Sequence, residues 1–146
     1  MSTPKFVYRV SPAPGTALFV AKVLGNFVFV SLLEALMAPL FVIFYNLHVM
    51  GPAWQLIPVA VLGTWALVVN GTFFAAMSVR TRSRELMLPL LLFPISIPAV
   101  LGMVAATTAI LTGDDPAHFY IVLLLTYDVV FTTACIALFE TVLQAE

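Results

Sequence analysis

Charged residues are scarce in this 146-residue sequence: they make up only 9% of it, whereas 62% of its residues are apolar. A soluble domain has about 45–50% apolar and about 25% charged residues, and it needs those charges to keep its surface in water. The composition therefore excludes a soluble enzyme domain. It also excludes an intrinsically disordered segment, which would be poor in large apolar side chains. We expect one transmembrane domain covering residues 1–146.

Several chemical signatures are also missing. The only cysteine is Cys135, which excludes a disulfide framework and a cysteine-based zinc site. The net charge of −1 leaves no basic excess to hold nucleic acid. We find no glycine-rich phosphate loop with a lysine, no His/Glu metal motif and no nucleophilic triad. We therefore expect a non-catalytic protein without a tightly bound cofactor or metal, and any ATP hydrolysis must take place on another chain.

Long uncharged runs dominate what remains. The 28 residues from Leu86 to Gly113 contain no ionisable side chain, and Glu34 is the only formal charge among the 57 residues from Val23 to Val79. A helix crosses the hydrocarbon core with about 20 apolar residues, and the Asn, Gly and Pro residues of segment 46–52 divide the longer run. Because the runs do not alternate as barrel strands do, we predict an all-α bundle of four membrane helices. The expected spans are about 20–45, 55–78, 87–112 and 119–142.

The basic residues predict the orientation. All six lie in two places, before or just at the start of the first span or between the second and third: Lys5, Arg9, Lys22, Arg80, Arg82 and Arg84. The two opposite loops, 46–54 and 113–118, contain none. Lysine and arginine favour the cytoplasmic side of a membrane. We therefore expect both termini to be cytoplasmic, in a protein of the cell inner membrane.

Two carboxyl groups are expected near the middle of the membrane, Glu34 in the first span and Asp128 in the fourth. Intramembrane acids are costly and often line a functional cavity or a proton pathway. Alternatively, each is neutral because of desolvation, or each bonds a neighbouring helix through Ser31, Asn26, Asn70 or Thr132. Both interpretations remain open at this stage.

Prolines and histidines mark two further candidates. Pro89, Pro94 and Pro98 lie in the third span, where each removes a helical hydrogen bond, so we expect a kinked or irregular helix. Such helices line cavities in transporters, but a static kink would serve packing alone. His48 and His118, both on the outer side, could ligate a haem iron or could be ordinary interfacial residues. Small-residue pairs, Gly71 with Ala75 and Gly102 with Ala106, are typical of close helix contacts.

The central stretch 70–98, NGTFFAAMSVRTRSRELMLPLLLFPISIP, resembles the CcmB family, the membrane subunits of the haem-exporter-type ABC complex of cytochrome c maturation. The flanking stretches KVLGN (22–26), YD (127–128) and LFETVL (138–143) agree with it, so the resemblance covers about residues 10–146. The resemblance implies a family pattern with about 70 further N-terminal residues, comprising two spans and an acidic cytoplasmic segment, that this sequence does not show.

The resemblance implies part of an ABC-2-type permease, a homodimeric core, a partner ATPase and a haem-handling membrane partner, with haem as the transported or handled ligand. The short loop with Arg80, Arg82, Arg84 and Glu85 feeds into the proline-rich span, and arginine suits acidic partners. We therefore expect it to dock the ATPase. Alternatively, these arginines only set the orientation and contact anionic headgroups. A non-transporting assembly subunit and a proton-coupled secondary carrier also remain possible functions.

Overall fold

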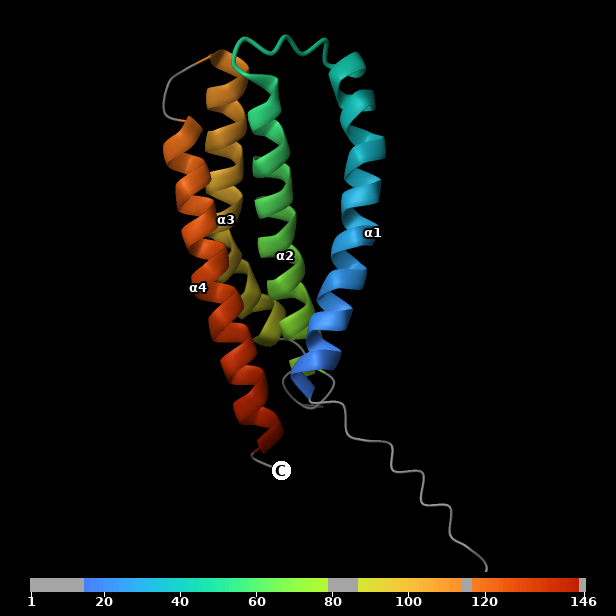
Figure 1. Ribbon diagram of the computed structural model, residues 1–146, viewed down its shortest axis with the longest axis vertical. Coiled ribbons are helices and arrows are strands. Elements are labelled where there is room, and N and C mark those ends of the chain that lie inside the picture. Colours follow the sequence, from blue (N-terminus) through green and yellow to red (C-terminus); the bar gives the residue numbers. More distant parts are fainter. Residues whose placement is uncertain (1–14, 79–86, 114–116, 145–146) are drawn as a thin grey trace, which may run out of the picture.

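The computed structural model describes residues 15–78, 87–113 and 117–144, and within these ranges it has four long helices and no strand. Each of the four is long and apolar enough to cross a membrane. The expected all-α membrane bundle is therefore confirmed (Figure 1). The helices are α1 (Gly15–Phe44), α2 (Leu56–Ser78), α3 (Met87–Thr112) and α4 (Ala117–Gln144), with a short 3-10 helix, η1 (Ala53–Gln55), before α2.

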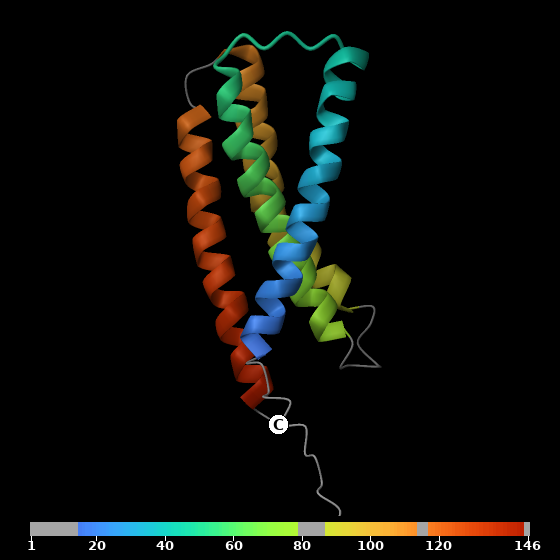
Figure 2. The ribbon, with the colours of Figure 1, turned by 45° about the vertical axis from the view of Figure 1, so that its right-hand side comes forward.

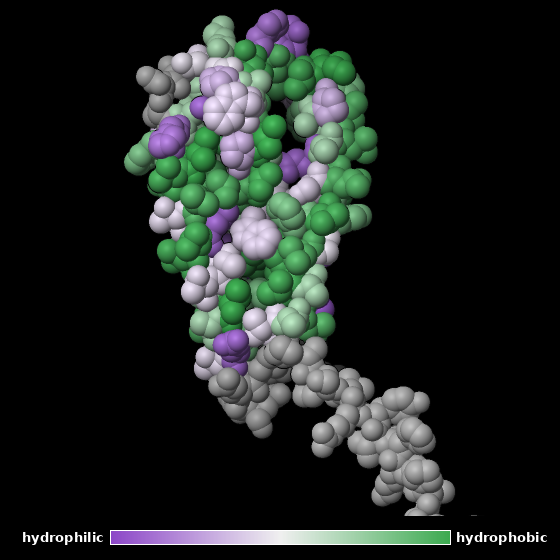
Figure 3. Space-filling model, viewed as in Figure 1, coloured by the Kyte–Doolittle hydropathy of each residue, from purple (hydrophilic) through white to green (hydrophobic). Residues whose placement is uncertain are grey.

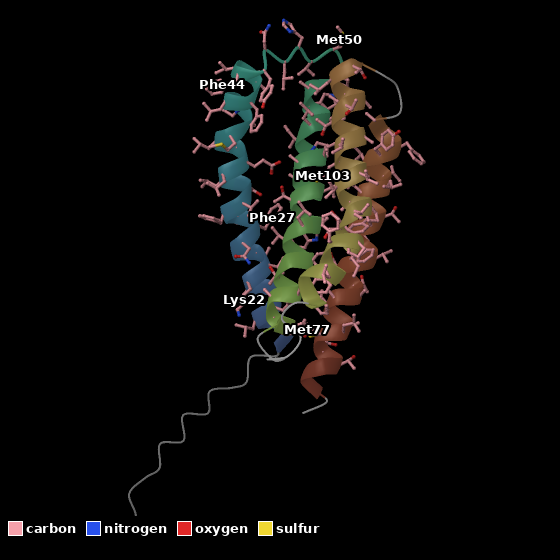
Figure 4. The ribbon with its side chains drawn as sticks, turned by 180° about the vertical axis from the view of Figure 1, so that it is seen from behind. Lys22, Phe27, Phe44, Met50, Met77 and Met103 are labelled. Atoms are coloured by element: carbon pink, nitrogen blue, oxygen red, sulfur yellow. The ribbon has the colours of Figure 1, made fainter. Side chains whose placement is uncertain are left out.

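The first helix begins at Gly15, five residues before the start expected from the sequence, whereas α2, α3 and α4 lie within two residues of the expected spans. In the structure Lys22 is exposed and points away from the other helices (Figure 4). A lysine near a helix end can do this because its long apolar stem carries the ammonium group toward the membrane surface.

The helices run alternately up and down, so two ends of the bundle can be distinguished (Figure 1). We call the end with residues 15, 78, 87 and 144 the lower end and the opposite one the upper end. At the upper end the loop after α1 is attached to α3, because the main-chain N–H groups of Met50 and Gly51 donate to the oxygens of Leu111 and Ile110 at 3.2 and 2.9 Å. A Cβ at Gly51 would lie 2.6 Å from the Ile110 oxygen, so this approach requires glycine.

Helices α2, α3 and α4 form a tightly packed unit. Small residues permit the close approach: a Cβ added at Gly63 of α2 would overlap the Met103 side chain of α3, and one at Gly102 would lie 3.2 Å from Leu124 of α4. Figure 4 shows Met103 where α2 and α3 run side by side. Gly71, by contrast, has no atom within 4 Å of an added Cβ. In lipid such packing contacts replace the hydrophobic effect as the force that joins helices.

Helix α1 joins this unit only near its lower end. Phe19 and Val23 are buried in a cluster with residues of α2 and α4, and Phe27 packs against Trp65 with ring centroids 5.5 Å apart. Above that point every described side chain of α1 from residue 28 to 44 is exposed except Ser31 and Glu34, which are half-buried. Figures 1 and 2 show the upper half of α1 leaning away from the other helices.

Candidate functional site

The divergence of α1 from α4 leaves an elongated depression over α2. The two outer helices meet at the lower end, where the Phe19 and Phe139 rings stack at 5.0 Å and the Thr16 hydroxyl donates to Glu140 at 2.9 Å. From there they separate toward the upper end (Figure 1). Figure 3 shows this face in space-filling form: it is mostly hydrophobic, with a hollow between the upper parts of α1 and α2.

Two cavities occupy this depression. One, of about 430 Å³, lies between α2 and α4 and includes Asp128 in its lining. The other, of about 330 Å³, lies between α1 and α2 and includes Glu34. Val61 of α2 lines both cavities, and Trp65, one turn further along α2, reaches both outer helices. We call the combined feature the α1–α4 groove: its floor is Val61 and Trp65, and its walls carry Glu34 and Asp128.

Glu34 is held by one hydrogen bond to α2. The Thr64 hydroxyl donates to its Oε2 at 2.6 Å, and Glu34 itself is half-buried. A carboxyl group that bonds across helices is a common polar link inside membranes. The bond therefore agrees with the interpretation in which Glu34 joins two helices by a hydrogen bond. Its partner, Thr64, is not one of the residues considered from the sequence.

Asp128 differs from Glu34 in having no such link. Its side chain is only 5% exposed, and neither carboxyl oxygen has a hydrogen-bond partner among the residues that the structure describes. Buried polar groups without a partner are rare, because they lose their hydration without compensation. Asp128 is the twelfth residue of α4 and so lies near mid-span, as its position in the sequence indicated.

Three of the four polar residues considered as partners of the two acids bond elsewhere. Asn26 donates to Thr72 at 3.2 Å, the Trp65 indole donates to Thr132 at 3.0 Å, and Asn70 donates to the Tyr127 hydroxyl at 2.8 Å. The alternative in which Asn26, Asn70 or Thr132 bonds one of the acids is therefore not what these bonds show. Depth along a helix can be read from the sequence, but the rotation that decides which side chains meet cannot.

A chain of two hydrogen bonds, one buried and one partly buried, joins three helices beside the prolines. Asn70 of α2 donates to Tyr127 of α4, which in turn donates to the main-chain oxygen of Ile95 in α3 at 2.7 Å. Ile95 lies between Pro94 and Pro98, both inside the helix, in a turn where prolines remove main-chain donors. The chain of bonds therefore fixes the proline-containing turn to its two neighbours.

The other predicted site residues occupy separate places. Pro89 lies in the first turn of α3, where a missing main-chain N–H costs no helical bond. The loop residues expected to dock the ATPase fall outside the described residues: Arg80, Arg82, Arg84 and Glu85.

The two histidines are both exposed at the upper end of the bundle. His48 has its Nδ1 at 3.0 Å from the Asn46 main-chain oxygen, and His118 lies at the start of α4. No group of three or more His, Cys, Asp or Glu that could hold a metal occurs within residues 15–78, 87–113 and 117–144.

The chain is similar to a set of bacterial membrane proteins. The model of the CcmB protein family matches residues 7–143. A "Heme exporter protein B" of Rhodobacter capsulatus is 38% identical over 92 residues, which are 62% of this chain and 41% of that protein. Proteins of the same name from Paracoccus denitrificans and Pseudomonas aeruginosa are 35% and 37% identical over 73% and 71% of this chain.

The chain spans less than half the length of these relatives, since the matches cover 41%, 48% and 46% of them. No solved structure matches it. The family match nevertheless extends over nearly the whole sequence, including the central stretch 70–98 and both walls of the groove. This chain therefore belongs to the CcmB family.

Proposed function

We propose that this protein is a non-catalytic membrane subunit of an ABC-type complex that exports or delivers haem for cytochrome c maturation. The observation that carries the proposal is the family match over residues 7–143, together with three relatives that are each named "Heme exporter protein B". The four apolar helices are consistent with a permease-type subunit. Haem is the handled cargo in this proposal, not a resident cofactor.

The proposal assigns the remaining work to partners. A separate ATP-binding subunit hydrolyses ATP, a haem-handling membrane protein exchanges the cargo, and two copies of this chain form the core. The subunit lies in the inner membrane with both termini in the cytoplasm, on the argument of its six basic residues. The segment 80–85 then faces the cytoplasm and docks the ATPase through its arginines, which suit acidic surfaces.

Co-purification tests this assignment. The tagged chain is expressed with the ATP-binding subunit and the haem-handling membrane protein of Rhodobacter capsulatus cytochrome c maturation, and the complex is isolated in detergent. We expect the ATP-binding subunit to be recovered with the tagged chain and to hydrolyse ATP. Recovery of no ATP-binding subunit from membranes that contain both proteins would contradict the proposal.

Two alternative functions differ in their energy source. An assembly subunit would bind the same partners but would leave haem release independent of ATP in the reconstituted complex. A secondary carrier would move its substrate with a proton gradient and without the ATPase, and the unpartnered carboxyl group of Asp128 in a cavity is the feature that favours it. Release assays with ATP, with a proton gradient and with neither separate the three functions.

A further inference from the structure

Helix α3 changes its packing at its prolines. Above them Ala99 and Ile110 are buried in the core that α3 shares with α2 and α4. Below them the described side chains face outward, with Leu90 72% and Phe93 74% exposed. Among the described residues of the helix, the first buried one is Ala99, which directly follows Pro98. The prolines therefore separate a packed upper segment of α3 from an exposed lower segment.

The lower segment of α3, residues 87–94, lies outside the core at the lower end of the bundle, as far as the structure describes it. That core consists of side chains from the other three helices, such as Phe19 of α1, Val69 of α2 and Cys135 of α4. Figure 2 shows the lower part of α3 standing apart from α4. Side-chain packing is the main force that joins helices in lipid, and segments with few buried contacts open most readily. The lower segment is therefore less restrained than the rest of α3.

Two prolines lie where the packing changes. Pro94 and Pro98, both inside the helix, lack the main-chain N–H groups that would bond the oxygens of Leu90 and Pro94, and their rings crowd those oxygens. Sharp bends in helices occur at such residues, and Figure 1 shows α3 changing direction in its lower half. The turn 94–98 is therefore the place where α3 bends most easily, and it coincides with the boundary between the two segments.

One hydrogen bond secures this turn. The Tyr127 hydroxyl donates to the main-chain oxygen of Ile95 at 2.7 Å. Apart from this bond, no side-chain hydrogen bond joins described residues of α3 to those of another helix. The hydroxyl is positioned from outside α3, since Asn70 donates to it at 2.8 Å and the Tyr127 ring stacks on Phe131 with centroids 4.2 Å apart. Tyr127 is therefore a fixed point to which the turn is attached by a single bond.

We propose that the turn 94–98 is a hinge of α3 and that the Tyr127 hydroxyl is its latch. While the bond to Ile95 is made, the lower segment keeps the direction seen in the structure. When the bond breaks, the lower segment pivots and the upper segment stays packed. One interhelical hydrogen bond in lipid favours the latched position by about three- to tenfold, which a partner at the lower end can outweigh. This inference goes beyond the proposed function because it concerns a motion of this chain, whatever cargo the complex carries.

Distances between spin labels test the hinge. The full chain is labelled in a Cys135→Ala background and placed in phosphatidylcholine vesicles. A lower pair, Leu90→Cys with Leu138→Cys, reports the lower segment of α3 against α4, and an upper pair, Val104→Cys with Val122→Cys, reports the packed segment. All four side chains are exposed, so the labels do not disturb the core. Double electron–electron resonance gives the distribution of distances, and we expect a main and a minor distance for the lower pair.

Two variants should change the lower pair in opposite directions. Tyr127→Phe keeps the ring but lacks the hydroxyl, so the minor distance should become about three- to tenfold more populated relative to the main one. Replacement of both Pro94 and Pro98 by Ala restores the missing donors and should leave one narrow distance. Tyr120→Phe is the matched control, since no hydrogen bond of its hydroxyl is found in the described residues. The upper pair should be unchanged in every variant.

Any of three results would contradict the hinge. The first is the same lower-pair distribution in Tyr127→Phe and in the unmodified chain. The second is an upper pair that broadens as much as the lower pair in Tyr127→Phe, which is the result expected of a general loosening of the bundle. The third is a minor distance that persists in the double alanine variant. That variant tests the hinge even if Tyr127→Phe does not fold, and circular dichroism of each variant shows whether the helices are retained.

Discussion

The Tyr127 hydroxyl donates a hydrogen bond to the main-chain oxygen of Ile95 at 2.7 Å and thereby joins α4 to the turn of α3 that lies between Pro94 and Pro98. The same hydroxyl accepts a bond from Asn70 of α2 at 2.8 Å. A single oxygen thus connects three helices at the place where proline weakens one of them. We therefore expect the removal of this one hydroxyl group, a very small change in volume, to lower the stability of the packing of all three helices.

Tyr127→Phe should destabilise the folded protein by about 1–2 kcal/mol, because it leaves the Asn70 amide and the Ile95 oxygen without their buried partner. The measurement is the unfolding midpoint in mixed micelles of rising SDS content. Tyr120→Phe is the control, since Tyr120 is half-buried near the upper end of α4 and no hydrogen bond of its hydroxyl is found in the described residues. Equal midpoints for the two variants would show that the chain of bonds contributes nothing.

Gly63→Val should disrupt the contact of α2 with α3, because even a Cβ at this position overlaps the Met103 side chain. Because the flexible Met103 side chain can partly move aside, we expect a cost at the low end of the overpacking range, about 1 kcal/mol. Gly71→Val provides a matched substitution on the same helix, where an added Cβ meets no atom within 4 Å. We expect Gly71→Val to unfold at or above the midpoint of the unmodified chain and Gly63→Val below it. The reverse order would contradict the α2–α3 packing.

Much of the fold follows from the sequence because charge-free runs of this length determine helices in lipid. The start of α1 was placed too late, at about residue 20, because length and hydropathy do not fix where a helix continues beyond the hydrocarbon core to Gly15. The bonding of the two acids was missed for a different reason, since it depends on helix rotation. The sequence does contain one indication of these pairs. Glu34 and Thr64 are separated from Val49, in the turn between α1 and α2, by the same number of residues, and the same holds for Asn26 and Thr72. An antiparallel helix pair brings such residues to the same depth.

No comparable register signal identifies Asp128 as unpartnered. Its neighbours Trp65 and Thr132 are suitable hydrogen-bonding residues by type and depth, yet they bond each other. The sequence predicted that Asp128 lies within the membrane, and only the packing of α2 on α4 shows that its carboxyl group lines a cavity. Which polar residues satisfy one another is decided by side-chain geometry across helices, to which a single sequence gives no access.

The orientation can be tested by cysteine labelling in a Cys135→Ala background. His48→Cys, at an exposed loop position at the upper end, should react with a membrane-impermeant maleimide on intact spheroplasts. Ser83→Cys, in the arginine segment, should react only after the membrane is permeabilised. The physical reason is that all six basic residues lie on the side of Ser83. The opposite labelling pattern would reverse the orientation.

Replacing Arg80, Arg82 and Arg84 together with Lys should reduce recovery of the ATP-binding subunit several-fold while leaving membrane insertion unchanged. Lysine keeps the positive charge that sets the orientation but lacks the planar fork that binds carboxylates in two places. Recovery is measured by quantitative immunoblotting of the purified complex. Full recovery in the triple variant would leave these arginines with a topological role alone.

The most direct measurement is the amount of covalently attached haem in c-type cytochromes of a Rhodobacter capsulatus strain that lacks its own "Heme exporter protein B", the relative that is 38% identical to this chain. This chain is expressed in the strain alone and, in a second culture, together with the part of that relative outside the match. If the chain is a subunit of the haem-delivery complex, haem staining returns in at least one of the two cultures. Staining absent from both, with the chain inserted in the membrane at normal levels, would contradict the account.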